Sequence, residues 1–381
     1  MKGIGILGTD GHIPHVAFMD TAEAMRRVGN NTGNLLFQYA VYNLIDEPKY
    51  LIGQDIPWDM TQIREKCRVI VIPAANFIRE NFDLTAMVEF LEKIDLPLLF
   101  FGLGAQARDY EQTEFDFHPS IDKLIALIRE RSKLVSVRGE FTARMLDRMG
   151  VSQALVTGCP SNHINPSTEL PQMIAKKLAK PMRSFITHGD EPWPKDRAKQ
   201  GVERKLVAWT REGASMMSQQ SVPVFMEYLR NNNPAATTEI PEKREGSLHA
   251  ALMPGTTMDE FLDFIAAKLR VYFSVHQWME DSSKYDFSVG LRLHGNMVAW
   301  QAGTPALWVY HDSRTQELAE TMALPRMPFQ TFIDECETVQ DAWKRVEFDP
   351  VAYGERRALL KSRIVKVMET EGIKVRGYQP A

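Results

Sequence analysis

Arginine and histidine stand two residues apart in the stretch "LRLHGN", residues 291–296, directly after an apolar run. Side chains alternate along a strand, so Arg292 and His294 are expected to point to the same side. Gly295 lets the backbone turn sharply, and a following helix would add free N–H groups and the positive end of its dipole. This combination predicts an anion site, most naturally for phosphate and carboxylate. The alternative is an arginine paired with a structural aspartate and a histidine bonded to backbone.

A second positive charge and an acid or base are expected from other strand ends. In "VAWTREG", Arg211 follows what reads as another strand of the same half, and would reach the same sheet edge. In "VTGCPSNHIN", His163 and its neighbour Asn162 follow the last strand of the first half and would face the anion site across a cleft. The alternatives are a solvent-facing arginine and an ordinary loop histidine. Arg138 also ends a strand, where pairing with Glu140 is the simpler expectation.

Two glycine-bearing stretches have a structural and a functional interpretation. "GNNTGN", residues 29–34, favours a turn, and Asn34 could cap the helix that follows. The functional alternative is a loop whose N–H groups and amides, from Asn31 and Asn34, face the cleft and bind an anion or sugar hydroxyls. "GIGILG", residues 3–8, matches G-x-G-x-x-G, but its glycines lie within a strand, so close backbone packing is favoured over a dinucleotide site.

The first half alternates short apolar runs with helical patterns. Strands are expected at 3–8, 68–73, 97–104, 134–139 and 154–158, and helices at 34–45, 84–94, 120–132 and 139–150. The strands are almost entirely apolar, which predicts a parallel sheet covered on both faces.

The alternation of strand and helix patterns becomes irregular after residue 159, and an interdomain connection is expected around 165–180. It resumes with segments at 205–210, 223–231, 258–269, 271–275, 285–295, 296–303 and 305–310. A polar, proline-bearing stretch at 231–247 reads as an exposed loop, and 355–372 as a helix. We therefore predict an α/β protein with two Rossmann-like domains facing across a cleft, at 1–170 and 171–350, followed by a helix and tail at 351–381. Ligands in such sheets bind beyond the carboxyl ends of the strands.

Bulk composition is that of an ordinary soluble protein: 381 residues, 44% hydrophobic, 25% charged. A formal net charge of −4 argues against nucleic acid as a partner. The three cysteines are far apart and no helical pair of metal ligands occurs, so neither disulfides nor a protein-bound metal is expected. No apolar run approaches the roughly 18 residues that span a bilayer, and the N-terminus does not read as a signal peptide. A cytoplasmic location is predicted.

Three stretches resemble the polysaccharide pyruvyl transferase family: "GNNTGNLLFQYAVYNLI", "VSVRGEFTARMLDRMGV" and "YDFSVGLRLHGNMVAWQAGTPAL". The resemblance implies a fold like that of two-domain GT-B glycosyltransferases. It also implies transfer of the enolpyruvyl group of phosphoenolpyruvate to a sugar, which forms a pyruvate ketal in exopolysaccharide, capsule or cell-wall glycan synthesis. No cofactor is implied, because phosphoenolpyruvate is a co-substrate. Expected partners are this donor and a sugar or lipid-linked oligosaccharide, through which the protein could associate peripherally with a membrane.

The resemblance also assigns roles. The R-L-H element contacts phosphoenolpyruvate in the family, which points to Arg292, Leu293 and His294. Gly295 and Asn296 continue this element into the helix. Arg211 matches a further arginine of the donor site, and His163 matches by position a first-domain histidine.

His294 would bind the donor and transfer a proton, with His163 as the opposed acid or base. The chain departs from the common pattern at Gly33-Asn34, where many members have Gly-Asp, and in "TGCPSN", where many have an acidic residue. Both departures concern the acceptor side. The rival functions are a nucleotide-sugar glycosyltransferase and a non-catalytic sugar- or phosphate-binding protein.

Overall fold

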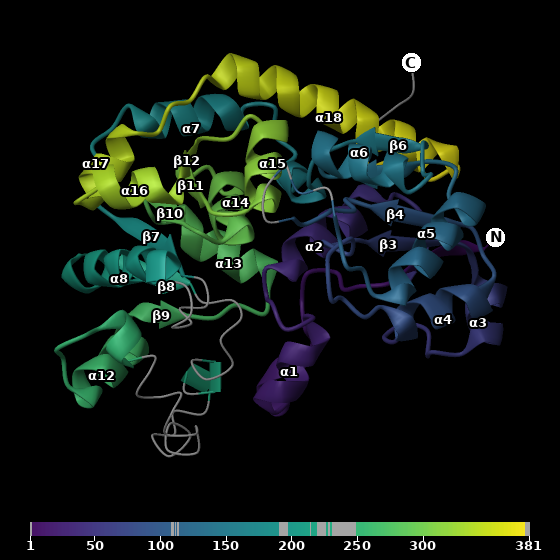
Figure 1. The fold of residues 1–381 in the computed structure, drawn as a ribbon, viewed down its shortest axis with the longest axis horizontal. Coiled ribbons are helices and arrows are strands. Elements are labelled where there is room, and N and C mark those ends of the chain that lie inside the picture. Colours follow the sequence, from purple (N-terminus) through teal and green to yellow (C-terminus); the bar gives the residue numbers. More distant parts are fainter. Residues whose placement is uncertain are drawn as a thin grey trace.

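The computed structural model describes residues 2–107, 110, 112, 114–189, 197–213, 215–218, 226–227, 229–230 and 249–377. In this part of the chain, each half contains a parallel sheet (Figure 1). The interpreted stretch 231–247 and most of 223–231 lie outside the described residues.

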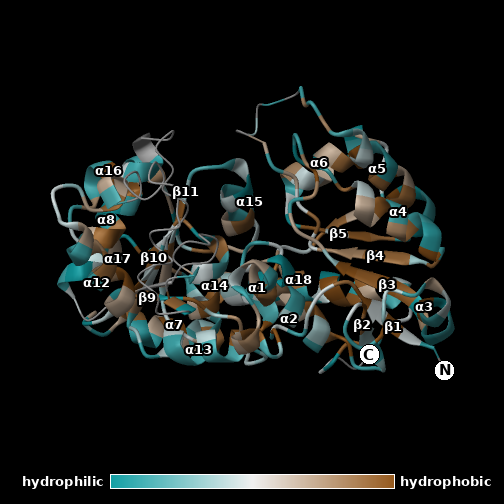
Figure 2. Ribbon diagram, turned by 90° about the horizontal axis from the view of Figure 1, so that it is seen from below, coloured by the Kyte–Doolittle hydropathy of each residue, from teal (hydrophilic) through white to brown (hydrophobic). Residues whose placement is uncertain are grey.

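The first sheet has the order β2-β1-β3-β4, and all its strand pairs are parallel. Its strands are β1 Gly3–Ile6, β2 Lys49–Leu51, β3 Cys67–Pro73 and β4 Leu98–Phe101. A parallel pair, β5 Val135–Val137 and β6 Ala154–Val156, continues it beyond β4 through a bridge between Leu103 and Val137. The helices are α2 Asn34–Leu44, α3 Met60–Lys66, α4 Thr85–Ile94, α5 Pro119–Arg131 and α6 Glu140–Arg148. Figure 2 shows hydrophobic strands such as β3 and β4 lying inside the more hydrophilic helices.

The glycines of "GIGILG" serve close packing. A Cβ atom on Gly3 would lie 2.4 Å from the Pro48 carbonyl oxygen, and one on Gly5 would lie 2.7 Å from the Ile70 side chain. No helix opens directly after β1, since the next element is the 3-10 turn Val16–Phe18. The structural interpretation of this stretch is therefore confirmed.

The second sheet has the order β12-β11-β10-β7-β8-β9, with parallel pairs throughout. Its strands are β7 Phe185–His188, β8 Ser215–Ser218, β9 Leu269–Arg270, β10 Phe287–Gly290, β11 Ala306–Tyr310 and β12 Arg326–Pro328. Numbered within this half, the order is that of the Rossmann sheet, and the direction of winding reverses between β7 and β10. The prediction of two Rossmann-like domains, as in the GT-B class, is confirmed.

The helices of the second half are α7 Leu170–Leu178, α8 Arg197–Glu212, α12 Met258–Lys268, α13 Val275–Ser283, α14 Leu293–Gln301, α15 Ser313–Thr321, α16 Phe329–Glu335 and α17 Val339–Lys344. The interpretation of 165–180 as a connection missed α7. The segment at 271–275 lies between two elements, because β9 ends at Arg270 and α13 begins at Val275.

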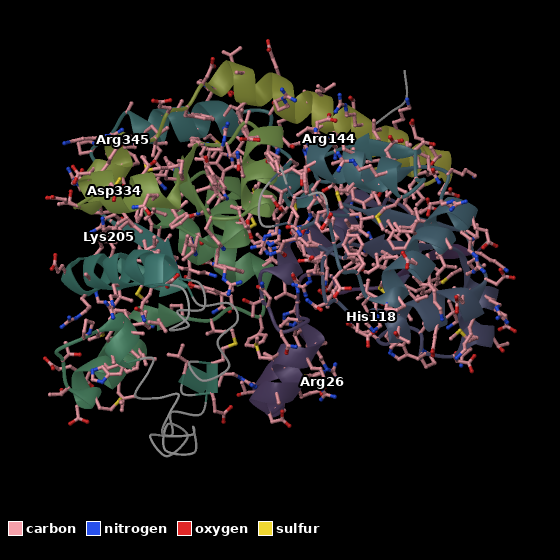
Figure 3. All side chains as sticks on the ribbon, in the orientation of Figure 1. Arg26, His118, Arg144, Lys205, Asp334 and Arg345 are labelled. Carbon is pink, nitrogen blue, oxygen red and sulfur yellow. The ribbon has the colours of Figure 1, made fainter. Side chains whose placement is uncertain are left out.

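The strand inferred at 205–210 is also wrong, because this run is the end of α8. Its apolar side chains Val202, Leu206 and Trp209 recur at helical spacing and are buried. Lys205, on the same helix, donates to the Ile333 and Cys336 carbonyls at 2.7 and 2.6 Å (labelled in Figure 3). These bonds satisfy carbonyls at the end of α16.

Both chain ends cross between the halves. The segment before and including α1 Thr21–Arg27 packs on the second half, where Arg230 donates to Thr21 at 3.0 Å. The last helix, α18 Pro350–Thr370, runs along one side of the molecule from the second half to the first (Figure 1). Its residues Ile364 and Met368 are fully buried against the first sheet.

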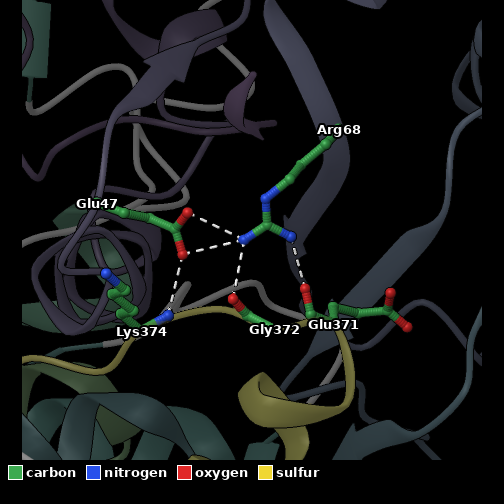
Figure 4. Close-up of polar contacts among 5 residues, drawn as sticks. All are labelled: Glu47, Arg68, Glu371, Gly372 and Lys374. Atoms are coloured by element: carbon green, nitrogen blue, oxygen red, sulfur yellow. Dashed lines mark hydrogen bonds and ion pairs between the residues drawn. The ribbon is translucent and has the colours of Figure 1, made fainter. Parts of the chain in front are cut away.

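Arg68 of β3 holds the segment that follows α18 against the first sheet by hydrogen bonds (Figure 4). Its guanidinium donates to the carbonyls of Glu371 and Gly372 at 2.6 and 3.0 Å, and to the Glu47 carboxylate at 2.9 Å. Glu47 in turn accepts a bond from the backbone N–H of Lys374 at 2.9 Å.

We expect Arg68→Ala to lower the free energy of unfolding by about 2 kcal/mol, because several charge-assisted hydrogen bonds are lost together. The C-terminal segment should also become sensitive to limited proteolysis. Urea denaturation and timed digestion measure the two effects. Arg376→Ala is the matched control, because its pair with Asp46 is 58% exposed on both sides. Equal stability of the two variants would show that Arg68 does not hold this segment.

Candidate functional site

Arg292 and His294 lie at the start of α14, directly after β10. The strand ends at Gly290, Arg292 is the N-cap, and His294 is the second residue of the helix. The prediction that both alternate along a strand is wrong, because the strand ends two residues earlier. The helix N-terminus has no side-chain cap, so its first N–H groups remain available.

This helix start lies at the reversal point of the second sheet. β10 and β7 are its two central strands, and they pair up to Gly290 and His188. A Cβ atom on Gly290 would lie 2.4 Å from the His188 carbonyl oxygen, so only glycine allows this approach. The carboxyl ends of strands at such a point are where ligands bind in open α/β sheets.

Asn296 holds α14 on the sheet instead of facing a ligand. It is fully buried, and its amide donates to the carbonyls of Gly290 and Leu307 at 2.9 and 3.2 Å. Its oxygen accepts the Ser288 hydroxyl at 2.8 Å, and Ser288 also lies 2.9 Å from His188 Nε2. Both donors of Asn296 are used internally, which corrects the expectation that it binds substrate.

The two residues beside His294 are also packed into the second half. Leu293 is 7% exposed and its carbonyl accepts the Trp308 indole N–H at 3.1 Å. Gly295 is buried within α14. Leu293 and Gly295 can therefore offer a ligand their backbone N–H groups only.

His294 contacts the first half of the chain. Its Nε2 lies 3.6 Å from Cys159 Sγ, and its ring centroid lies 5.5 Å from that of Phe37 on α2. Burial lowers the pKa of His294 well below its ordinary value, and the charges of Arg138, Arg314 and Arg292 lower it further. The imidazole is therefore neutral at physiological pH.

Arg138 is a rigid cation at this junction. It is 3% exposed and donates to the carbonyls of Gly102 and Ala74 at 2.9 and 3.2 Å, and to Asn76 Oδ1 at 2.7 Å. The expected pairing with Glu140 is absent from these contacts. Arg138 instead ties together the loops that follow β3 and β4.

Arg314 and Arg79 complete the cationic cluster, and the sequence interpretation missed both. Ser313 exchanges bonds with the backbone of Ala107 at 3.1 and 2.9 Å, which sets the start of α15 beside the loop after β4. A bridge between Ile78 and Ala105 sets Arg79 beside the same loop. Burial first, and then the charge of Arg314, lowers the pKa of Arg79.

The positive charges and N–H donors of Arg79 and Arg314 are only partly satisfied by neighbouring groups. Among the described residues, the shielded Nε atoms of Arg79 and Arg314 have no hydrogen-bond partner. Arg314 forms an ion pair with Asp312 at 3.4 Å. We call Arg79, Arg138, Arg292 and Arg314 the arginine cluster; like charges held this close favour a bound anion.

Arg211 lies elsewhere. It is exposed in the last turn of α8, a few residues before β8 begins, and its charge acts on Glu260. A helix that leads into a parallel strand ends at the amino edge of the sheet, whereas Arg292 lies at the carboxyl edge. The assignment of Arg211 to the donor site is therefore wrong.

His163 and Asn162 face α18. The Asn162 side-chain oxygen accepts the Tyr353 hydroxyl at 2.8 Å. His163 is 9% exposed, and its pKa is lowered well below its ordinary value by burial and by the charges of Arg357 and Lys361. Of the residues that follow β6, Cys159 is the one that meets His294, which corrects the expected place of His163.

Residues 29–34 form the turn that was one of the two interpretations. Gly29 and Asn30 have φ of 61° and 58°, and Gly33 is the N-cap of α2, so Asn34 does not cap it. Asn31 Oδ1 accepts the Gly33 N–H at 2.8 Å, and Asn34 donates to the Val28 carbonyl at 2.9 Å. A substrate role for Asn31 and Asn34 stays a prediction.

Glu317 of α15 joins the second half to α6 of the first. Its carboxylate accepts the N–H and the hydroxyl of Thr142 at 2.8 and 2.9 Å. Burial raises its pKa to about 7, although the Thr142 bonds and Arg138 oppose this. It also lines a cavity of about 310 Å³ between α6, α15 and α18, together with Arg144 and Arg363.

Within the described ranges, no three side chains of His, Cys, Asp or Glu are grouped as metal ligands. The same part of the chain has no helix of sufficient length and hydropathy to cross a membrane.

The family described as polysaccharide pyruvyl transferase matches residues 31–313. No curated protein matches the chain. Among solved structures, UDP-N-acetylglucosamine 2-epimerase from Rickettsia bellii is similar at 13% identity, with 97% of this chain and 96% of that chain covered and a TM-score of 0.44. The Methanocaldococcus jannaschii UDP-GlcNAc 2-epimerase in complex with UDP-GlcNAc and UDP has 12% identity, 97% and 100% coverage and a TM-score of 0.46.

Proposed function

Because this chain belongs to the polysaccharide pyruvyl transferase family, we propose that it transfers the enolpyruvyl group of phosphoenolpyruvate to a sugar. The products would be a pyruvate ketal and phosphate. The acceptor would belong to an exopolysaccharide, capsule or cell-wall glycan, either free or lipid-linked. The observation that carries this proposal is the arginine cluster, which gathers at the uncapped start of α14 from both halves of the chain.

The charges of the donor match this cluster. Phosphoenolpyruvate carries a phosphate and a carboxylate, both of which suit the planar fork of a guanidinium group. Arg292 would hold one of the two anions together with the N–H groups of Leu293 and Gly295. Arg314, at the start of α15, and Arg79 of the first half would hold the other.

His294 would change its protonation when the donor binds. The surrounding guanidinium charges favour the neutral imidazole in the empty site. A bound trianion offsets these charges, so the pKa of His294 rises and the ring can take up a proton. It would then be the acid that protonates the methylene carbon, and afterwards a base for the attacking hydroxyl.

Protonation of the methylene carbon leaves an oxocarbenium-like centre at C2. A sugar hydroxyl attacks C2, the phosphate leaves, and a second hydroxyl closes the ketal. The arginine cluster would stabilise the charge that accumulates on the departing phosphate.

Calorimetric titration with phosphoenolpyruvate, and in parallel with UDP, tests the donor. We expect binding of phosphoenolpyruvate alone, and phosphate release only when a panel of hexosides and hexosamines supplies an acceptor. Release of a nucleotide from nucleotide sugars would instead identify a glycosyltransferase. Donor binding without turnover across the panel and with lipid-linked oligosaccharides would indicate a binding protein.

A further inference from the structure

Cys159 occupies an unusually polar place for a buried cysteine. It is fully buried in the loop that follows β6, and its Sγ lies 3.6 Å from His294 Nε2 across the domain junction. Its other side receives the Ser161 hydroxyl, which donates to Sγ at 3.0 Å. Arg138 adds a positive charge that interacts with Cys159.

The ring nitrogen of His294 that faces away from Cys159 is open. Among the described residues Nδ1 has no hydrogen-bond partner, and it is not one of the shielded unpaired atoms. Phe37 packs against the ring, so its orientation is fixed by contacts from the first half. The imidazole therefore has one edge against the thiol and an open nitrogen on the other edge, and the charges of Arg138, Arg314 and Arg292 act on the ring.

We propose that Cys159 is a positioning residue and proton partner of His294, sharing one proton with Nε2 so that Nδ1 can act on the substrate. The proposal rests on the function proposed above. In this arrangement His294 is the acid or base, and Cys159 is the further group that orients it, as in catalytic triads. Two states are possible for the pair: thiol with neutral imidazole, and thiolate with imidazolium. In the second state, the Ser161 hydroxyl and the imidazolium both donate to the sulfur, and Arg138 compensates its charge.

The Cys159–His294 pair can supply and take back every proton that the first addition step needs. The Cys159 proton moves to Nε2 as the Nδ1 proton moves to the methylene carbon of phosphoenolpyruvate, which leaves a thiolate and a neutral ring. When the first acceptor hydroxyl attacks C2, its proton passes to Nδ1 and the Nε2 proton returns to sulfur. The C2–O bond to phosphate then breaks, and the second hydroxyl gives its proton to the departing phosphate as it closes the ketal.

The other two cysteines are matched controls. Burial raises the pKa of Cys67 to about 11 and also raises the pKa of Cys336. Both thiols are therefore protonated at neutral pH. A thiolate signal near pH 7 would belong to Cys159.

The test measures thiolate absorbance at 240 nm at neutral pH in the full-length protein, before and after saturation with 2-phospholactate, a saturated analogue of phosphoenolpyruvate, with folding monitored by circular dichroism. Because a bound anion favours the imidazolium, we expect one thiolate that forms when the analogue binds, is lost in Cys159→Ala and in His294→Ala, and is kept in Cys67→Ala and Cys336→Ala. Phosphate release with the identified acceptor should fall about 10²-fold in Cys159→Ala. It should recover in Cys159→Asp, whose carboxylate can hold the same proton.

The outcomes separate this proposal from the proposed function. A thiol absorbance that the bound analogue does not change, or that changes equally in His294→Ala, overturns the proton pair, even if phosphoenolpyruvate binds. A His294-dependent thiolate that forms with inorganic phosphate, in a protein that does not bind phosphoenolpyruvate, supports the pair and overturns the proposed donor. Full activity in a folded Cys159→Ala protein shows that the contact only packs the junction.

Discussion

Arg292→Ala should lower the kcat/KM for phosphate release from phosphoenolpyruvate by about 10²- to 10³-fold, as expected when one donor to the developing charge is removed. The physical reason is that Arg292 is the N-cap of α14 and would add its charge where the N–H groups of the first turn would face the anion. His294→Ala should cause a loss of about 10²- to 10⁴-fold, because a proton carrier is removed. Coupled-enzyme assays of phosphate measure both.

Arg211→Ala is the matched control, because it removes an arginine of the same half that lies at the opposite edge of the sheet. Its activity should equal that of the unchanged protein. Arg314→Ala should weaken donor binding, which a raised KM would report. Near-normal turnover in a folded Arg292→Ala variant would show that the donor does not bind at the start of α14.

Stability should fall as the pH rises from about 4.5 to about 7, because of Glu317. Its pKa is about 7 in the folded chain against an ordinary value of 4.5. Between these values the folded state holds a proton that the unfolded state releases, so the stabilisation present below pH 4.5 is lost as the pH approaches 7. The full effect is about 3 kcal/mol, at about 1.4 kcal/mol for each pH unit.

Glu317→Gln should remove this dependence, since a neutral amide can still accept the Thr142 N–H. Urea unfolding at pH 5 and pH 8 measures the difference between the two proteins. Glu320→Gln on the same helix is the control, because Glu320 is exposed. Parallel pH dependence in all three proteins would show that the Glu317 carboxyl does not titrate in this range.

Much of the fold could be predicted because its signals are local. The run "RVIVIP" after its first residue, and the run "PLLFFGLG", are apolar at every position, which identifies β3 and β4 without knowledge of the tertiary structure. Local signals fail where a short apolar run fits both the two-residue period of a strand and the 3.6-residue period of a helix. "KLVAWT" reads as a short strand, but the polar residues before it belong to the same helix, α8.

The site was predictable only in part, because its members meet through tertiary structure. Arg292 and His294 stand in one motif, whereas Cys159 meets His294 across 135 positions of the sequence. The resemblance to the family marked this cysteine only as a departure on the acceptor side. For Arg314 a local signal did exist: "HDSRT" places an aspartate N-cap before it at the end of β11, so a charged first turn at the carboxyl edge could have been inferred.

The return of α18 to the first sheet has a consequence for biosynthesis. The first half leaves the ribosome early, but the apolar surface under Ile364 and Met368 stays uncovered until the last residues have been translated. Its folding should therefore finish last, although its synthesis finishes first. A chain stalled before residue 364 should bind holdase chaperones through this surface, even though both sheets are already synthesised.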